Sequence, residues 1–235
     1  MDYTLTYFIQ LILVSAAMIL LLGTMTYSKV YWEEAGVGGR LFVWLAIFAF
    51  LPMIGDYCIN LNAMSLHGFD IPFNTAPCFT AAPVLWVFRQ PFDAVLALYV
   101  YVTWKDKVHR FRILVYVIFL LAAMATVLHF ISVVLGYVMS LGMLPMWMAR
   151  PIGVLSMTYH LLLPVLLFLA DRRLFLYYVL VVATGFGLNK MIPIGTPLSV
   201  MNVELLVFCH ISAMNVFFED DGTKAALAGS IEEEA

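Results

Sequence analysis

Long runs of apolar residues separated by short polar segments dominate the pattern along the chain. None of these runs alternates apolar and polar residues as a strand of a membrane barrel does. Because a backbone in lipid must satisfy its own hydrogen bonds, an apolar run of about 20 residues predicts a transmembrane helix. The pattern therefore predicts an all-α integral membrane protein, a bundle of seven transmembrane helices over Leu5–Tyr27, Leu41–Ile59, Pro83–Trp104, Ile113–Val138, Ile152–Ala170, Leu174–Ile192 and Leu198–Phe218.

The composition supports the membrane assignment and excludes several classes of protein. Hydrophobic residues make up 64% of the 235 residues, charged residues make up only 11%, and the mean hydropathy is +0.97. A soluble domain of this length needs far more polar side chains to cover its surface. With a net charge of −3, the chain also lacks the basic surface that nucleic-acid binding requires. The expected partner is the lipid bilayer, with other membrane subunits or further copies of the chain as additional partners.

The lysine and arginine residues predict the orientation of the bundle. Nine of the 12 fall on one side of the predicted helices, at Lys29, Arg40, Lys105, Lys107, Arg110, Arg112, Arg172, Arg173 and Lys224. Arg89, Arg150 and Lys190 fall on the other side. The positive-inside rule then places the N-terminus outside and the C-terminus in the cytoplasm of a plasma or inner membrane.

The chain is expected to form one domain with a short extension. Residues 1–218 make the bundle, and residues 219–235 make an acidic cytoplasmic tail. The first helix is expected to be retained, because Asp2 and a first basic residue at Lys29 do not fit the basic start of a secretory signal. The segment Asn60–Ala82 is predicted to be one long loop on the outer side.

Ionisable side chains inside the predicted helices mark the candidate site, because such groups are costly in lipid. Counting the helical rise from the predicted ends places Asp56, Arg89, His129 and Glu204 nearest the outer surface. Asp93 and His160 lie deeper, and His210 is deepest. The inner half of the predicted helices is almost wholly apolar. We therefore expect a cavity that opens outward and is sealed below, with a pocket for a small polar or cationic solute or for protons formed by Asp56, Arg89, Asp93, Asn202 and Glu204.

Arg89 and Asp93 are four residues apart on one predicted helix, so the two side chains can form an ion pair. Such a pair serves either ligand or proton handling, or only helix packing. Pro91 lies between them and is expected to kink the helix and open a pocket at that height.

Three histidines on three different helices suggest a second kind of site. His129, His160 and His210, with nearby carboxylates, can supply ligands for a transition metal, or two of them can hold a haem b. The chain has no His-x-x-x-His or Glu-x-x-His spacing, and each histidine taken alone is also explained by hydrogen bonding between helices.

The cysteines and tryptophans give further predictions. Cys58 and Cys78 bracket the outer loop, where they either form a disulfide bridge or remain two thiols. The five tryptophans fall near predicted helix ends and are interpreted as the aromatic belt, with no other role.

These features leave three hypotheses for function. The first is a transport protein that binds a small polar or cationic solute or protons in the outer cavity. The second is a metal- or haem-dependent oxidoreductase subunit, the one hypothesis under which the chain is an enzyme. The third is a seven-helix receptor or sensor that acts through a partner, which depends on analogy of topology alone.

Overall fold

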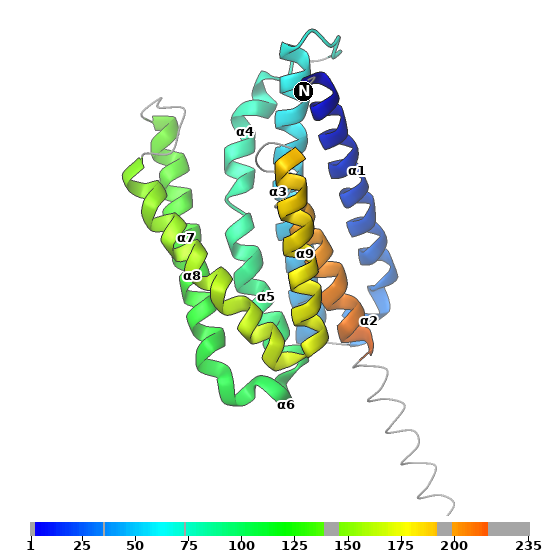
Figure 1. The fold of residues 1–235 in the computed structure, drawn as a ribbon, viewed down its shortest axis with the longest axis vertical. Helices are drawn as coiled ribbons and strands as arrows, with labels where there is room; N and C mark the ends of the chain where they lie inside the picture. Colours follow the sequence, from blue (N-terminus) through cyan, green and yellow to red (C-terminus); the bar gives the residue numbers. More distant parts are fainter. Residues whose placement is uncertain (1–2, 35, 73, 139–145, 192–198, 216–235) are drawn as a thin grey trace, which may run out of the picture.

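Every secondary-structure element in the described part of the chain is helical (Figure 1). The computed structural model describes residues 3–34, 36–72, 74–138, 146–191 and 199–215. The elements are α1 (Tyr3–Tyr27), α2 (Lys29–Glu34), α3 (Val37–Leu66), α4 (Ala76–Trp86), α5 (Arg89–Thr103), α6 (Lys105–Val108), η1 (His109–Phe111), α7 (Arg112–Val138), α8 (Met146–Ala170) and α9 (Arg172–Met191). Residues 199–215 form a last helix. The predicted all-α class is confirmed, whereas the acidic tail lies outside the described residues.

Four of the described helices are long and apolar enough to cross a membrane. They cover Leu5–Tyr27, Val37–Leu66, Lys105–Gly136 and Ala149–Ala170. Large apolar side chains on these helices point away from the core, with Ile19 71%, Ile113 72% and Val154 66% exposed. Exposed side chains of this size are costly in water and favourable in lipid. The helices therefore indicate a membrane protein.

The long helices run alternately in opposite directions, so the short elements collect at the ends of the bundle (Figure 1). The N-terminus lies at one end, and α2, α6 and the turn between α8 and α9 lie at the other. Eight exposed basic residues belong to this second end, namely Lys29, Arg40, Lys105, Lys107, Arg110, Arg112, Arg172 and Arg173. The described lysine and arginine residues are therefore concentrated at the end of the bundle opposite the N-terminus.

Helix α3 is longer than the apolar pattern predicts, which corrects the expected loop Asn60–Ala82. The helix continues to Leu66 and ends in a Schellman motif, in which the N–H of Phe69 donates to the carbonyl of Met64 at 3.2 Å. The N–H of Gly68 donates to the carbonyl of Ser65 at 3.1 Å, and Gly68 has a φ of 88° that glycine adopts without strain. Because α4 begins at Ala76, the connection is only residues 67–75.

The predicted helix Pro83–Trp104 is interrupted. Helix α4 ends at Trp86 and α5 begins at Arg89, with Val87 and Phe88 in a turn between them. Pro91 explains the break, because proline has no N–H to donate and its ring clashes with the carbonyl four residues earlier, at Val87. Where a kink was expected from Pro91 the structure thus has a helix break, whereas α3 and α8 continue through Pro52 and Pro164.

The last helix packs against α9 and α3, which brings its first residues to the candidate site. The rings of Tyr177 in α9 and Phe208 stack with centroids 4.6 Å apart. Further along, Gly185 of α9 leaves room for the side chain of Met201, which a Cβ at position 185 would overlap. On the α3 side, the rings of Phe42 and His210 lie 4.6 Å apart.

Candidate functional site

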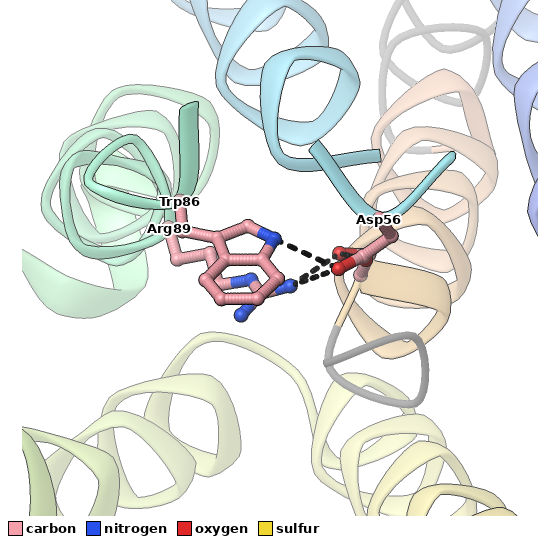
Figure 2. Close-up of polar contacts among 4 residues, drawn as sticks. Asp56, Trp86 and Arg89 are labelled. Atoms are coloured by element: carbon pink, nitrogen blue, oxygen red, sulfur yellow. Dashed lines mark hydrogen bonds and ion pairs between the residues drawn. The ribbon is translucent and has the colours of Figure 1, made fainter. Parts of the chain in front are cut away.

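A buried carboxylate joins three separate segments of the chain (Figure 2). Asp56 of α3 has only 2% of its side chain exposed and accepts hydrogen bonds from three donors. The indole Nε1 of Trp86 donates to Oδ1 at 2.8 Å, and the guanidinium Nη2 of Arg89 donates to the same oxygen at 2.7 Å. The hydroxyl of Ser199 donates to Oδ2 at 2.5 Å and accepts from Nη2 of Arg89 at 3.2 Å. This network ties α3, the α4–α5 break and the last helix together.

A glycine and the helix break explain why these side chains meet. A Cβ at Gly55 would lie 3.1 Å from the indole of Trp86 and 3.2 Å from the carbonyl oxygen of Ala82, so glycine permits the close approach of α3 and α4. The break after Trp86 then allows Arg89 to lie over the same indole, 5.0 Å from the ring centroid, in a cation–π contact. Trp86 therefore has a role beyond the aromatic belt, which corrects the sequence interpretation.

The ion pair that the structure shows for Arg89 is with Asp56, not with Asp93 as the sequence spacing predicted. The physical reason is the direction of helical side chains, which lean toward the N-terminus of their helix. Arg89 is the first residue of α5, so its side chain extends away from Asp93 and toward α3. Asp56 thus compensates the charge of Arg89, and the charge of Asp93 requires another partner.

Asp93 faces helix α8 instead. Its Oδ2 lies 4.0 Å from Nδ1 of His160, and its side chain is 8% exposed whereas that of His160 is 45% exposed. Tyr159 is buried beside the same carboxylate, and the hydroxyl of Tyr178 donates to the backbone carbonyl of His160 at 3.3 Å. A carboxylate, an imidazole and two phenols therefore gather between α5, α8 and α9.

These groups line a cavity of about 580 Å³ between α5, α8, α9 and the last helix. This volume falls within the range of about 300–1,000 Å³ that is typical of small-molecule sites. Much of the lining is apolar or aromatic, as in other ligand sites. The polar part of the lining consists of Arg89, Gln90, Asp93, Ser156, Tyr159, His160, Tyr178 and Asn202.

The structure distributes the five predicted pocket residues unequally. Arg89, Asp93 and Asn202 line the cavity, whereas Asp56 is connected to it through Arg89. Glu204 is half-buried and is not among the lining residues. It follows Asn202 by two positions, and residues two apart on a helix point to different sides.

The three histidines have separate partners. Nδ1 of His129 lies 3.1 Å from Oε1 of Gln90, and His160 faces Asp93. His210 lies in the other half of the bundle, with Nε2 2.6 Å from the hydroxyl of Ser28, which follows α1. Across the described residues, no three His, Cys, Asp or Glu side chains gather closely enough to hold a metal ion. The metal and haem hypothesis therefore gains no support from the described part of the chain.

A second cavity of about 680 Å³ lies between α1 and the last helix, near His210. Apart from His210, its polar lining consists of Thr24, Tyr27 and Asn215. Thr24, Tyr27 and Asn215 are uncharged polar side chains, so the described lining of this cavity offers no carboxylate or other full charge for a solute. The cavity at Asp93 is therefore the stronger candidate for a solute site.

Several site residues gave little or no signal in the sequence. Ser199, Tyr159, Tyr178 and Gln90 are neutral polar residues, which are common in transmembrane helices and do not stand out as buried charges do. Tyr159 had one usable signal, because it directly precedes His160. Ser199 had none, since its contact with Asp56 joins residues far apart in the chain.

The disulfide bridge between Cys58 and Cys78 stays a prediction. Cys58 is half-buried in α3, and Cys78 belongs to α4, which packs against α3 at Gly55. The side chain of Cys78 lies outside the described residues.

We expect alkylation of the unreduced, denatured protein to leave both Cys58 and Cys78 unmodified and alkylation after reduction to modify both, as read by peptide mass. Cys209 serves as the internal control because it should be alkylated in both samples, and modification of Cys58 and Cys78 without reductant would contradict the bridge.

Comparison with known proteins gives no further guide to the site. No protein-family model matches the chain, and no curated protein or solved structure is significantly similar to it. The functional argument therefore depends on the geometry at Asp93.

Proposed function

We propose that the chain is a seven-helix membrane carrier whose cavity binds a small polar or cationic solute at Asp93. The observation that carries the proposal is a buried carboxylate on the wall of a ligand-sized cavity, with the imidazole of His160 and the phenol of Tyr159 beside it. Arg89 does not neutralise Asp93, because Arg89 is paired with Asp56. With His160 uncharged, Asp93 is therefore the one described lining charge that no described side chain compensates, and it favours a cation.

The arrangement of the helices supports seven crossings. Four of the described helices are each long and apolar enough to cross the membrane without a second segment. In the proposal, α4 and α5 together make one interrupted crossing, and α9 and the last helix make two more. Interrupted helices are tolerated in membranes where they line a cavity, as α5 does. An odd number of crossings puts the termini on opposite sides, and the basic end opposite the N-terminus favours an external N-terminus and a cytoplasmic C-terminus.

The topology predicts the behaviour of reporter fusions. Alkaline phosphatase fused after Lys107 is expected to be inactive and green fluorescent protein at the same position fluorescent, because this basic segment lies in the cytoplasm in the proposal. Fusions after Asp70, in the connection between α3 and α4, serve as the control and should give the opposite result. Phosphatase activity at Lys107 would overturn the proposed orientation.

The binding proposal is tested with a panel of ammonium ions and neutral polar solutes. We expect ammonium ions to raise the melting temperature of the wild-type protein in detergent and to have no such effect on Asp93→Asn. An equal shift in both proteins would contradict a site at Asp93. Counterflow of a bound ion in proteoliposomes then separates a carrier from a receptor, because a receptor binds the ion without moving it across the membrane.

A further inference from the structure

We propose that the cavity at Asp93 takes a small organic ammonium ion and that this ion displaces a proton from His160. The inference rests on the proposed function and names the class of solute and the ion exchanged for it. Its basis is that Asp93 and His160 line one cavity together, 4.0 Å apart, with aromatic side chains around them.

The lining favours an organic cation over a metal ion. Ca²⁺ and Mg²⁺ require about six or more oxygen ligands, often from several carboxylates, whereas the described lining of this cavity holds one carboxylate, that of Asp93. Tyr159, Tyr178 and Phe186 supply aromatic surface instead. Aromatic rings attract ammonium groups through cation–π interactions, and alkyl substituents on the ammonium pack against apolar walls. A carboxylate set among tyrosines therefore fits a substituted ammonium ion.

Because Asp93 pairs with His160, binding of an ammonium ion at Asp93 competes with binding of a proton at His160. When His160 is protonated, the imidazolium compensates the charge of Asp93. An ammonium ion at Asp93 takes over that compensation and repels the imidazolium, so His160 loses its proton. No covalent bond to the solute forms or breaks. The proton leaves Nδ1 or Nε2 for water in the cavity that His160 lines.

The other ionisable groups around the pair do not take this role. On α3 and α5, Asp56 and Arg89 compensate each other. On α7, His129 contacts Gln90. Tyr159 of α8 and Tyr178 of α9 carry phenols, which stay protonated near neutral pH. Glu204 of the last helix is not a lining residue, and Lys105, Asp106 and Lys107 of α6 are exposed at the basic end. His160 is thus the described group that can exchange a proton against a cation at Asp93.

Choline is a suitable probe because its quaternary ammonium carries no proton, so any proton released on binding comes from the protein. Calorimetry of choline binding at pH 6 in buffers of different ionisation enthalpy counts the released protons. We expect a release above zero and at most one per choline, because imidazole changes charge between about pH 5 and 8. In that range the affinity should fall with decreasing pH, approaching about tenfold per pH unit. The neutral isostere 3,3-dimethylbutan-1-ol should bind far more weakly and release none.

Variants distinguish the exchange from the site itself. His160→Gln should still bind choline, with no proton release and no pH dependence, whereas Asp93→Asn should lose binding. His129→Gln is the matched control, since it removes an imidazole outside the cavity and should release protons as the wild type does.

Choline binding to the wild type without proton release would overturn the exchange and leave the cavity proposal standing. A second outcome is that the wild type binds other solutes but not choline, with that binding lost in Asp93→Asn. This result would overturn the assignment of an ammonium ion and leave the site at Asp93 standing. These wild-type outcomes decide the proposal even if a variant does not fold.

Discussion

Asp93→Asn is expected to lose cation binding while the protein remains folded. The substitution keeps the shape of the side chain and removes only the charge that faces His160 and the cavity. Removing one partner of a buried charge pair in a binding site costs about 2–5 kcal/mol, so the dissociation constant should rise about thirty-fold or more. Binding measured by calorimetry and melting temperature measured in the same detergent separate the loss of the ligand from a loss of structure.

The pairing of Arg89 with Asp56 makes this prediction sharper. If Arg89 were paired with Asp93, neutralising Asp93 would leave a buried cation uncompensated and would unfold the protein. Because Asp56 compensates Arg89, that cost is not expected for Asp93→Asn. Glu204→Gln is the matched control, since it neutralises a carboxylate on the neighbouring last helix that does not line the cavity. Unchanged affinity in Asp93→Asn, or an equal loss in Glu204→Gln, would contradict a site at Asp93.

The sequence located helices well where apolar content alone decides their extent. Predicted and observed bounds of α1 and α7 agree within two residues at each end. The end of α3 was missed because the helix continues past its apolar run and stops only where Gly68 adopts a positive φ. A kink was predicted at Pro91, but the complete break at Val87 and Phe88 was not, because it follows from a clash with the carbonyl four residues earlier in the chain.

The candidate site was predictable in its charges and not in its pairings. Asp56, Arg89 and Asp93 stand out in any sequence of this hydropathy, because buried charges in lipid need a reason. Which carboxylate pairs with Arg89 depends on the approach of α3 to α4 at Gly55 and on the direction of the Arg89 side chain. Both are properties of the packed bundle. A spacing of four residues shows only that a pair can form.

Asp56→Asn is expected to produce the largest loss of stability among single substitutions at the site. It removes the charge that compensates Arg89 while the guanidinium remains largely buried, with 16% of that side chain exposed. Breaking a buried ion pair on one side costs about 3–5 kcal/mol of the free energy of unfolding. Trp86→Phe removes only one of the three donors to Asp56 and should cost less, about 1.5–3 kcal/mol for a hydrogen bond to a charged group.

The double variant Asp56→Leu with Arg89→Met tests whether the loss comes from the unpaired charge. It replaces both charges with apolar side chains, a change that is often close to neutral in buried pairs, so it should be more stable than Asp56→Asn alone. Unfolding by sodium dodecyl sulfate in mixed micelles gives the free energies. Comparison of the double variant with the single variants Asp56→Leu and Arg89→Met completes a cycle, and its non-additivity measures the coupling between the two residues. A stability of Asp56→Asn equal to that of the wild type, or additive losses in the double variant, would show that this pair does not hold α3 to α5.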